Sequence, residues 1–170
     1  MKKTLIALLV TFTSLVACKK EDTTPTNNTN NNNNNNNTGN CQDEYICFKL
    51  DGTDISKPAS GYVLADTFLF VKYEEGEKQL SIDIFGKNTG AYTVGDERIS
   101  GRARVYYFPQ NNVTYMSGKG SFNVTELTTA NKITGTFSAT LYNYDSNNNT
   151  FTYTDSMVIT NGTFTKVQLN

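Results

Sequence analysis

The chain has 170 residues, with 15 lysines and arginines against 16 aspartates and glutamates, and it contains neither histidine nor tryptophan. The lack of histidine excludes Ser-His-Asp and Cys-His nucleophiles, as well as histidine-based zinc sites. No Gly-x-Gly-x-x-Gly or phosphate-binding loop follows a predicted strand, so we expect neither an enzyme nor a cofactor.

The first 17 residues have the pattern of a signal peptide. Met1-Lys2-Lys3 supplies a positive start, and residues 5–16 form an apolar run too short for the roughly 20 residues of a membrane-spanning helix. The segment Leu15-Val16-Ala17-Cys18 resembles the lipobox of bacterial lipoproteins. This resemblance implies cleavage before Cys18 and attachment of acyl chains, such as palmitate, to that residue. Each buried methylene contributes about 0.8 kcal/mol, so several chains would hold the protein to a membrane nearly permanently.

A polar tether is expected from residue 18 to residue 40. It is rich in Thr and Asn, with an unbroken asparagine run from Asn30 to Asn37. Such a segment has no apolar area to offset the entropy of ordering, so we expect it to be disordered. Its acidic pair Glu21-Asp22 resembles the surface-export signal of Bacteroidota lipoproteins, which implies an outer-membrane location facing the cell exterior. Asp22-Thr23-Thr24 resembles Bacteroidota O-glycosylation sites, which implies a modification at Thr23.

Two further cysteines, Cys41 and Cys47, stand six residues apart. On a straight strand they would lie about 20 Å apart, which no disulfide can bridge. A turn at Gln42-Asp43-Glu44 would bring them together, and thiols oxidise outside the inner membrane. We therefore expect a local disulfide rather than a metal site, because two ligands without partners do not hold zinc.

Residues 41–170 are sufficient for one domain with a substantial core. They carry 11 lysines and arginines against 14 aspartates and glutamates, a formal charge of −3. This balance argues against nucleic acid or an anionic lipid surface as a partner. The composition predicts no particular oligomeric state.

Periodicity predicts that this domain is all-β. Apolar and polar side chains alternate at 80–84, 122–125 and 133–141, whereas no segment of helical length shows an i, i+3, i+4, i+7 stripe. Turn signals such as Asp51-Gly52 and Asn161-Gly162 separate the runs. We expect a single antiparallel β-sandwich or meandering β-barrel of about eight to ten strands. The expected strands are 45–50, 67–73, 79–85, 91–94, 98–108, 115–127, 132–144, 150–160 and 162–168.

Glycine and phenylalanine stand two residues apart at three places: Gly120-Ser121-Phe122, Gly135-Thr136-Phe137 and Gly162-Thr163-Phe164. Residues two apart share one face of a strand, so a ring can cover the bare backbone beside a glycine of a neighbouring strand. We interpret this pattern as core architecture, because the unequal spacings exclude a solenoid or propeller repeat.

Four segments carry a resemblance to a known family: "FKLDGTDIS", "NTGAYTVG", "KITGTFSATLYN" and "VITNGTF". Together they are similar to an uncharacterised family of small Bacteroidota surface lipoproteins, a domain of unknown function. The resemblance covers most of residues 45–167. It implies a β-rich fold, a lipid anchor and a surface location, but it brings no activity and no catalytic residues. The long Asn tether and the pair Cys41 and Cys47 depart from the family pattern.

Tyrosines are the main candidates for a ligand-binding surface. With Leu141 facing inward, alternation places Tyr142 and Tyr144 on the outer face. Exposed tyrosines beside asparagines suit sugar or peptide recognition, because the ring stacks while the hydroxyl and amide groups form hydrogen bonds. The alternative is a second sheet face that buries the same rings. Further candidates on adjacent strands are Tyr106, Tyr115 and Tyr153.

Charged residues offer weaker candidates. Arg102 and Arg104 share a strand face and would suit an anion or an acidic glycan, although a solvated face is the better explanation of them. The Asp145 loop begins like a calcium loop but lacks its glycine and its final glutamate, so we expect a hairpin turn and no metal. The loosely clustered acids Asp51, Asp54, Asp66 and Asp83 are interpreted as turn residues and a solvated strand face.

Two functional classes are compatible with this sequence. One is a surface binding or adhesion module whose tether presents a β-sandwich to a glycan or a protein. The other is a non-catalytic accessory subunit that docks on an outer-membrane complex. Glycan-array binding would favour the first class, and co-purification of one partner after mild detergent extraction would favour the second.

Overall fold

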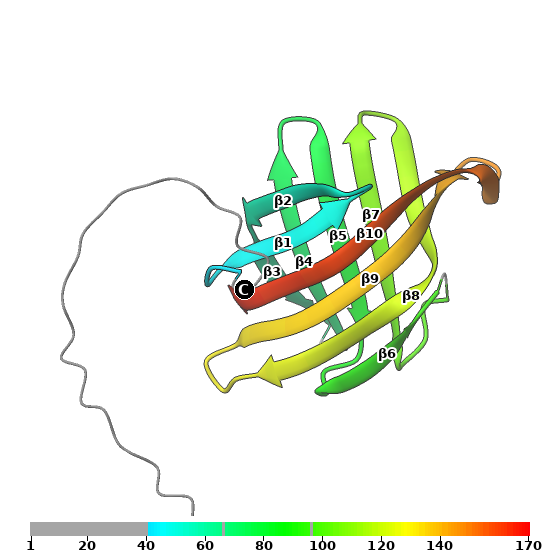
Figure 1. The fold of residues 1–170 in the computed structure, drawn as a ribbon. Helices are drawn as coiled ribbons and strands as arrows, with labels where there is room; N and C mark the ends of the chain where they lie inside the picture. Colours follow the sequence, from blue (N-terminus) through cyan, green and yellow to red (C-terminus); the bar gives the residue numbers. More distant parts are fainter. Residues whose placement is uncertain (1–40, 66, 96) are drawn as a thin grey trace, which may run out of the picture. The chain divides into compact units, whose positions relative to one another are not determined.

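A computed structural model describes residues 41–65, 67–95 and 97–170. Within these ranges the chain forms ten β-strands and no helix, so the prediction of an all-β domain is confirmed (Figure 1). No described segment forms a helix long and apolar enough to cross a membrane. The predicted signal peptide, the lipidation site Cys18, the tether and Thr23 lie outside the described residues.

The strands join into one sheet with the order β2-β1-β10-β9-β8-β6-β7-β5-β4-β3, and β7 also pairs with β8. Nearly all neighbours are antiparallel, the exception being a short parallel contact between β6 and β7. The sheet is not closed into a barrel. The strands are β1 (Tyr45–Leu50), β2 (Thr53–Pro58), β3 (Ser60–Leu64), β4 (Phe68–Glu75), β5 (Lys78–Phe85), β6 (Gly90–Val94), β7 (Arg102–Gln110), β8 (Val113–Leu127), β9 (Lys132–Asp145) and β10 (Thr150–Gln168).

The sheet folds over itself, so that β1, β10, β9 and β8 lie across β4, β5 and β7 (Figure 1). The chain passes between these two layers at β2 and β3, which lie at opposite ends of the strand order and are separated only by Ala59. The end of the chain reaches β3 as well, because Asn170 donates to the carbonyl of Gly61 and accepts from the amide of Val63. The folded sheet therefore encloses one core.

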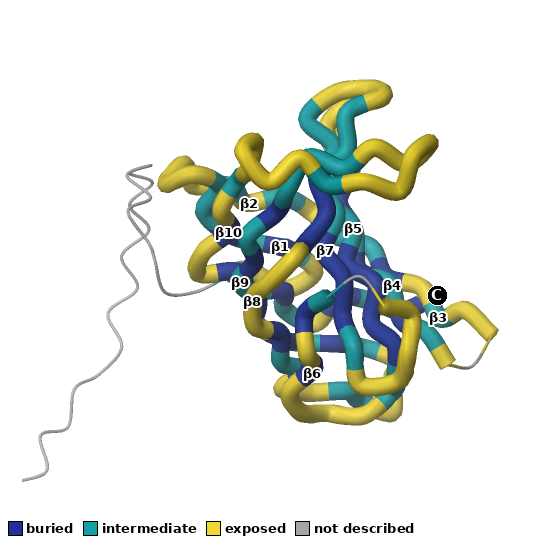
Figure 2. The backbone as a smooth tube through the Cα atoms, turned by 90° about the vertical axis from the view of Figure 1, so that its right-hand side faces the viewer, coloured by how far each residue is buried: buried dark blue, intermediate teal, exposed yellow. Residues whose placement is uncertain are grey.

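Inward-facing side chains of both layers fill this core, and Figure 2 shows the buried stretches along the strands with exposed turns at their ends. Phe48 of β1 contacts Tyr73 of β4 with ring centroids 6.0 Å apart. It also contacts Phe137 of β9 at 6.1 Å. The alternation that predicted the strands is thus the pattern of burial, with Leu80, Ile82 and Ile84 all fully buried.

Two strands, β2 and β3, were not predicted from the sequence. Residues 53–58 include aspartate, serine, lysine and proline and have no clear apolar face, as is common for an edge strand. In the opposite sense, the predicted strands 150–160 and 162–168 form the single strand β10. The turn signal at Asn161 is a β-bulge instead, where φ is 53° and the register with β9 shifts.

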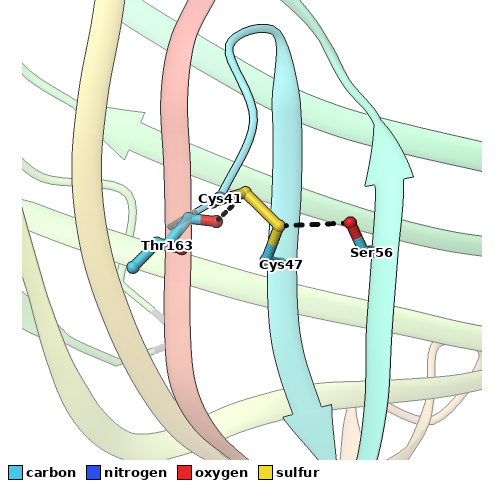
Figure 3. Close-up of a disulfide and its surroundings, with 4 residues drawn as sticks. All are labelled: Cys41, Cys47, Ser56 and Thr163. Atoms are coloured by element: carbon cyan, nitrogen blue, oxygen red, sulfur yellow. Dashed lines mark hydrogen bonds between the residues drawn. A yellow bond between two sulfur atoms is a disulfide. The ribbon is translucent and has the colours of Figure 1, made fainter. Parts of the chain in front are cut away.

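The expected disulfide between Cys41 and Cys47 is present, with the two Cα atoms 5.7 Å apart (Figure 3). The chain turns before β1, where Glu44 has a φ of 65° and the amide of Tyr45 donates to the carbonyl of Gln42. The Cys47 sulfur also lies 3.3 Å from the hydroxyl of Ser56 on β2. The disulfide therefore links Cys41, the first described residue, to strand β1.

Candidate ligand-binding surface

Four aromatic side chains form a continuous row on the hairpin of β9 and β10. The ring of Tyr142 meets that of Tyr153 edge to face at 5.0 Å, and Tyr153 stacks on Phe151 at 5.7 Å. Phe151 in turn contacts Tyr144 at 5.0 Å. We call Tyr142, Tyr153, Phe151 and Tyr144 the aromatic row. Tyr153 is its most open member, with 68% of its surface exposed.

The row borders a shallow pocket of about 260 Å³. Its lining consists of Tyr142, Phe151 and Tyr153 from the row, with Gly118 and Lys119 from the neighbouring strand β8. Gly118 is the extra residue of a β-bulge, since Ser117 pairs with Leu141 while Lys119 pairs with Thr140. A Cβ atom at Gly118 would lie 2.7 Å from Cε2 of Tyr142, so glycine is what lets this ring lie against the strand.

The polar groups at this pocket are available to a ligand. Lys119 is exposed, and within the described part of the chain it makes no ion pair or hydrogen bond. The same holds for the hydroxyl groups of Tyr142 and Tyr153. Only Tyr144 uses its hydroxyl internally, donating to the side-chain oxygen of Asn149 at 2.7 Å.

Tyr115 was predicted to join this surface, and this prediction is wrong. Its ring lies on the inner face, 7% exposed, and its hydroxyl donates to both carboxylate oxygens of Asp155 at 2.8 and 2.9 Å. Burial and the bond to Asp155 raise the pKa of Tyr115. The amide of Asn143 also donates to Asp155, at 3.0 Å. These bonds fix Asp155 in the bulge at residues 153–155, which also contains Tyr153.

Tyr106 lies on the same outer face as the aromatic row, but Met116 separates it from Tyr142. It pairs across the sheet with Met116, which in turn pairs with Tyr142, so the three side chains lie side by side on one face. Met116 is only 3% exposed. Burial raises the pKa of Tyr106, whose ring stacks on Phe108 with centroids 6.2 Å apart. Tyr106 therefore belongs to a covered part of the outer face.

The arginines predicted for an anion site are engaged with carboxylates of the protein. Arg102 pairs with Glu97 at 2.9 Å, and Arg104 lies 3.5 Å from Asp83. The Arg104 guanidinium also stacks over the rings of Phe85 and Tyr106, at 5.3 and 5.1 Å. Each positive charge thus has an internal counter-charge.

Asp83 itself does not lie on a solvated face, contrary to the interpretation from the sequence. It is 9% exposed, and burial raises the pKa of its carboxyl against the opposing effect of Arg104 and Arg98. Asp51, another of the four acids, accepts the backbone amide of Val158 at 2.8 Å. Asp66 lies outside the described residues. The described part of the chain brings no three His, Cys, Asp or Glu residues together as metal ligands.

The loop after β9 is a polar turn. Asp145 accepts hydrogen bonds from the backbone amides of Asn147 and Asn148 and from the side chain of Asn148. The bond from Asn148 is the largest effect that lowers the pKa of Asp145. This carboxylate is therefore used to close the hairpin that carries the aromatic row.

Sequence reasoning found Tyr142, Tyr144 and Tyr153 and missed Phe151, Gly118 and Lys119. Phe151 has a detectable signal, because it stands two residues before Tyr153 and shares its side of a strand. Gly118 and Lys119 depend on a bulge that alternation alone does not reveal. Comparisons with protein-family models, curated proteins and solved structures found no match.

Proposed function

We propose that this protein is a lipid-anchored binding module that presents the aromatic row to a saccharide at the cell exterior. The observation that carries this proposal is the row itself, in which each of four aromatic rings contacts the next beside a pocket, and one of them is largely exposed. Aromatic rings pack on the apolar faces of a ligand, and convergent hydroxyl and amino groups fix its orientation.

The module is proposed to bind its ligand without chemical conversion. The two carboxylates of the hairpin are Asp145 and Asp155, and both accept hydrogen bonds from neighbouring groups of the protein. They serve to shape the turn and the bulge, respectively. A hydrolase that uses two carboxylates needs them on opposite sides of the bound substrate.

Binding is tested with the full chain carrying Cys18→Ser, which removes the proposed lipidation site. We expect this protein to bind members of a glycan array and the double variant Phe151→Ala/Tyr153→Ala to lose that binding. Tyr62→Ala is the matched control, because Tyr62 is an exposed aromatic residue of β3 that is absent from the pocket lining. Equal binding by the double variant would contradict the proposed site. The absence of any array signal from the Cys18→Ser protein would contradict the proposed function.

Anchoring by Cys18 and exposure at the outer surface remain proposals drawn from the sequence. Wild-type protein should incorporate labelled palmitate, and Cys18→Ser should not. Protease added to intact cells should remove the protein if it faces outward, whereas protection until the outer membrane is opened would place it in the periplasm.

An accessory subunit of an outer-membrane complex is the second candidate. It is favoured by a separate apolar area at the edge of the sheet, where Tyr62 is 41% exposed and Leu64 is 56% exposed. The two residues share one face of β3 and pair with Phe70 and Phe68 of β4. A partner that co-purifies after mild detergent extraction, and is lost in Tyr62→Ser/Leu64→Ser, would favour this role over saccharide binding.

A further inference from the structure

We propose that the saccharide bound by the aromatic row is anionic and that Lys119 binds its carboxylate or sulfate group. This inference rests on the proposed function, since it assigns the ligand class at the same surface. It requires that a positive charge be available at the pocket and that an anion be recognised there specifically.

Lys119 differs from most lysines of the domain. Five other lysines form ion pairs with carboxylates of the protein. These pairs are Lys49 with Asp54, Lys57 with Glu75, Lys72 with Glu74, Lys132 with Glu44, and Lys166 with Asp43. Of the three other lysines in residues 41–65, 67–95 and 97–170, Lys87 also has an interaction of its own, whereas Lys78 and Lys119 have none. Of these two, only Lys119 lines the pocket.

The bulge in β8 places the Lys119 side chain beside the rings. Gly118 has no side chain, and Tyr142 lies against its backbone, so both the strand and this ring line the pocket. Tyr153 and Phe151 complete the lining. A sugar ring packed on Tyr153 would therefore have an ammonium group and two free phenolic hydroxyl groups within the same site.

The volume of the pocket limits what it can hold. About 260 Å³ is below the roughly 300–1,000 Å³ of sites that enclose drug-sized ligands. The pocket therefore suits one ring-sized group. Further sugar units of an oligosaccharide would lie along the row over Phe151 and Tyr144, whose rings continue the same surface.

The net charge of this domain would not attract an anionic saccharide. The formal charge of residues 41–170 is −3, and Asp145 and Asp155 lie on the same hairpin as the row. The net charge of the domain thus disfavours a negatively charged chain. Binding of an acidic saccharide would have to depend on Lys119 and on ring stacking, which makes single substitutions informative.

The experiment measures affinity with matched pairs of ligands that differ only in charge. The probes are trigalacturonate and its methyl ester, and a sulfated galactose trisaccharide and its unsulfated parent. Titrations use the full chain with Cys18→Ser at low salt. We expect one anionic probe to bind roughly twofold to fivefold more tightly than its neutral counterpart, the size expected for an exposed ion pair. The preference should shrink as salt is added.

The variants separate charge from stacking. Lys119→Gln should weaken the anionic probe more than its neutral counterpart and so remove the preference, whereas Lys119→Arg should keep the preference. Tyr153→Ala and Gly118→Ala should weaken both probes, the latter because the added Cβ displaces the Tyr142 ring. Lys78→Gln is the matched control and should bind like the wild type. Melting curves of each variant establish that it is folded.

The outcomes distinguish this inference from the proposed function. Equal affinity for anionic and neutral probes, or a preference that persists in Lys119→Gln, would overturn the role of Lys119 while saccharide binding stands. Failure of both anionic probes to bind would overturn it as well. Loss of all saccharide binding, including the glycan array, would overturn the proposed function together with this inference.

Discussion

The ring of Phe137 on β9 covers the backbone of Gly162 on β10, and a Cβ at Gly162 would lie 2.6 Å from Cε1 of that ring. The relationship is reciprocal, since a Cβ at Gly135 would lie 2.4 Å from Cζ of Phe164. Gly135 pairs directly with Phe164, and Phe137 pairs with Gly162. Two of the three Gly-x-Phe segments thus interlock. The phenylalanine ring of each segment occupies the space beside the glycine of the other.

Gly162→Ala should therefore destabilise the domain. The new methyl group would meet both the Phe137 ring and the Phe137 carbonyl oxygen at 2.6 Å, and overpacking of this kind costs about 1–3 kcal/mol. Gly95→Ala is the control, because the nearest atom to its Cβ would be Nη1 of Arg102 at 3.8 Å. Urea unfolding measures both variants. Similar midpoints for the two would show that the ring does not constrain position 162.

Alternation along β9 makes a second prediction about adjacent residues. Phe137 is 3% exposed and Thr136 faces solvent. Phe137→Ala should cost about 3–5 kcal/mol because it leaves a cavity, whereas Thr136→Ala should cost under about 1 kcal/mol. Urea unfolding of both variants gives the comparison. Equal costs at the two positions would contradict the inward and outward faces assigned to this strand.

Alternation predicts side-chain direction only as far as the next bulge, which explains which parts of the surface were predictable. On β9 the pattern runs unbroken to Leu141, so Tyr142 and Tyr144 were placed correctly. On β8, Phe122 faces inward, and counting back by twos would turn Tyr115 outward. The extra residue at Gly118 reverses the count, so Tyr115 faces the core.

Contacts between distant segments were likewise beyond the sequence pattern. Asp83 does lie on the outer face between Ile82 and Ile84, as alternation indicates. Its burial arises because Arg104 of β7 lies across it, and no local pattern reports which strand will be the neighbour. Short polar edge strands such as β2 were missed for the same reason, since their pairing with β1 is what defines them.

The disulfide should stabilise the domain modestly. The loop it closes spans only six residues in sequence, for which chain-entropy reasoning gives about 2 kcal/mol. In the chain with Cys18→Ser, only Cys41 and Cys47 remain, so a reductant should lower the urea midpoint of this protein. The variant that also carries Cys41→Ser/Cys47→Ser should have the urea midpoint of the reduced protein, and adding reductant should not change it. A midpoint that is the same with and without reductant would contradict this contribution.

Asp83 should give the stability of the domain a distinct pH dependence. Burial raises the pKa of its carboxyl above the ordinary value of 3.8, so the folded protein binds this proton more tightly than the unfolded chain does. The resulting contribution to stability is fully present below the unfolded pKa and is lost as the pH rises through the folded pKa.

Asp83→Asn cannot titrate, so its free energy of unfolding relative to wild type should increase as the pH rises from about 3 to about 7. The net shift already includes the pairing with Arg104, because that ion pair exists only when Asp83 is ionised. Effects of the substitution on packing add an offset that does not depend on pH, so the trend with pH, rather than the value at one pH, is the readout. Urea unfolding at several pH values measures this trend, with Asp54→Asn as the control because Asp54 is an exposed partner of Lys49. A flat difference would show that burial and the pairing with Arg104 cancel at this carboxylate, and a difference that falls as the pH rises would show that the pairing outweighs burial.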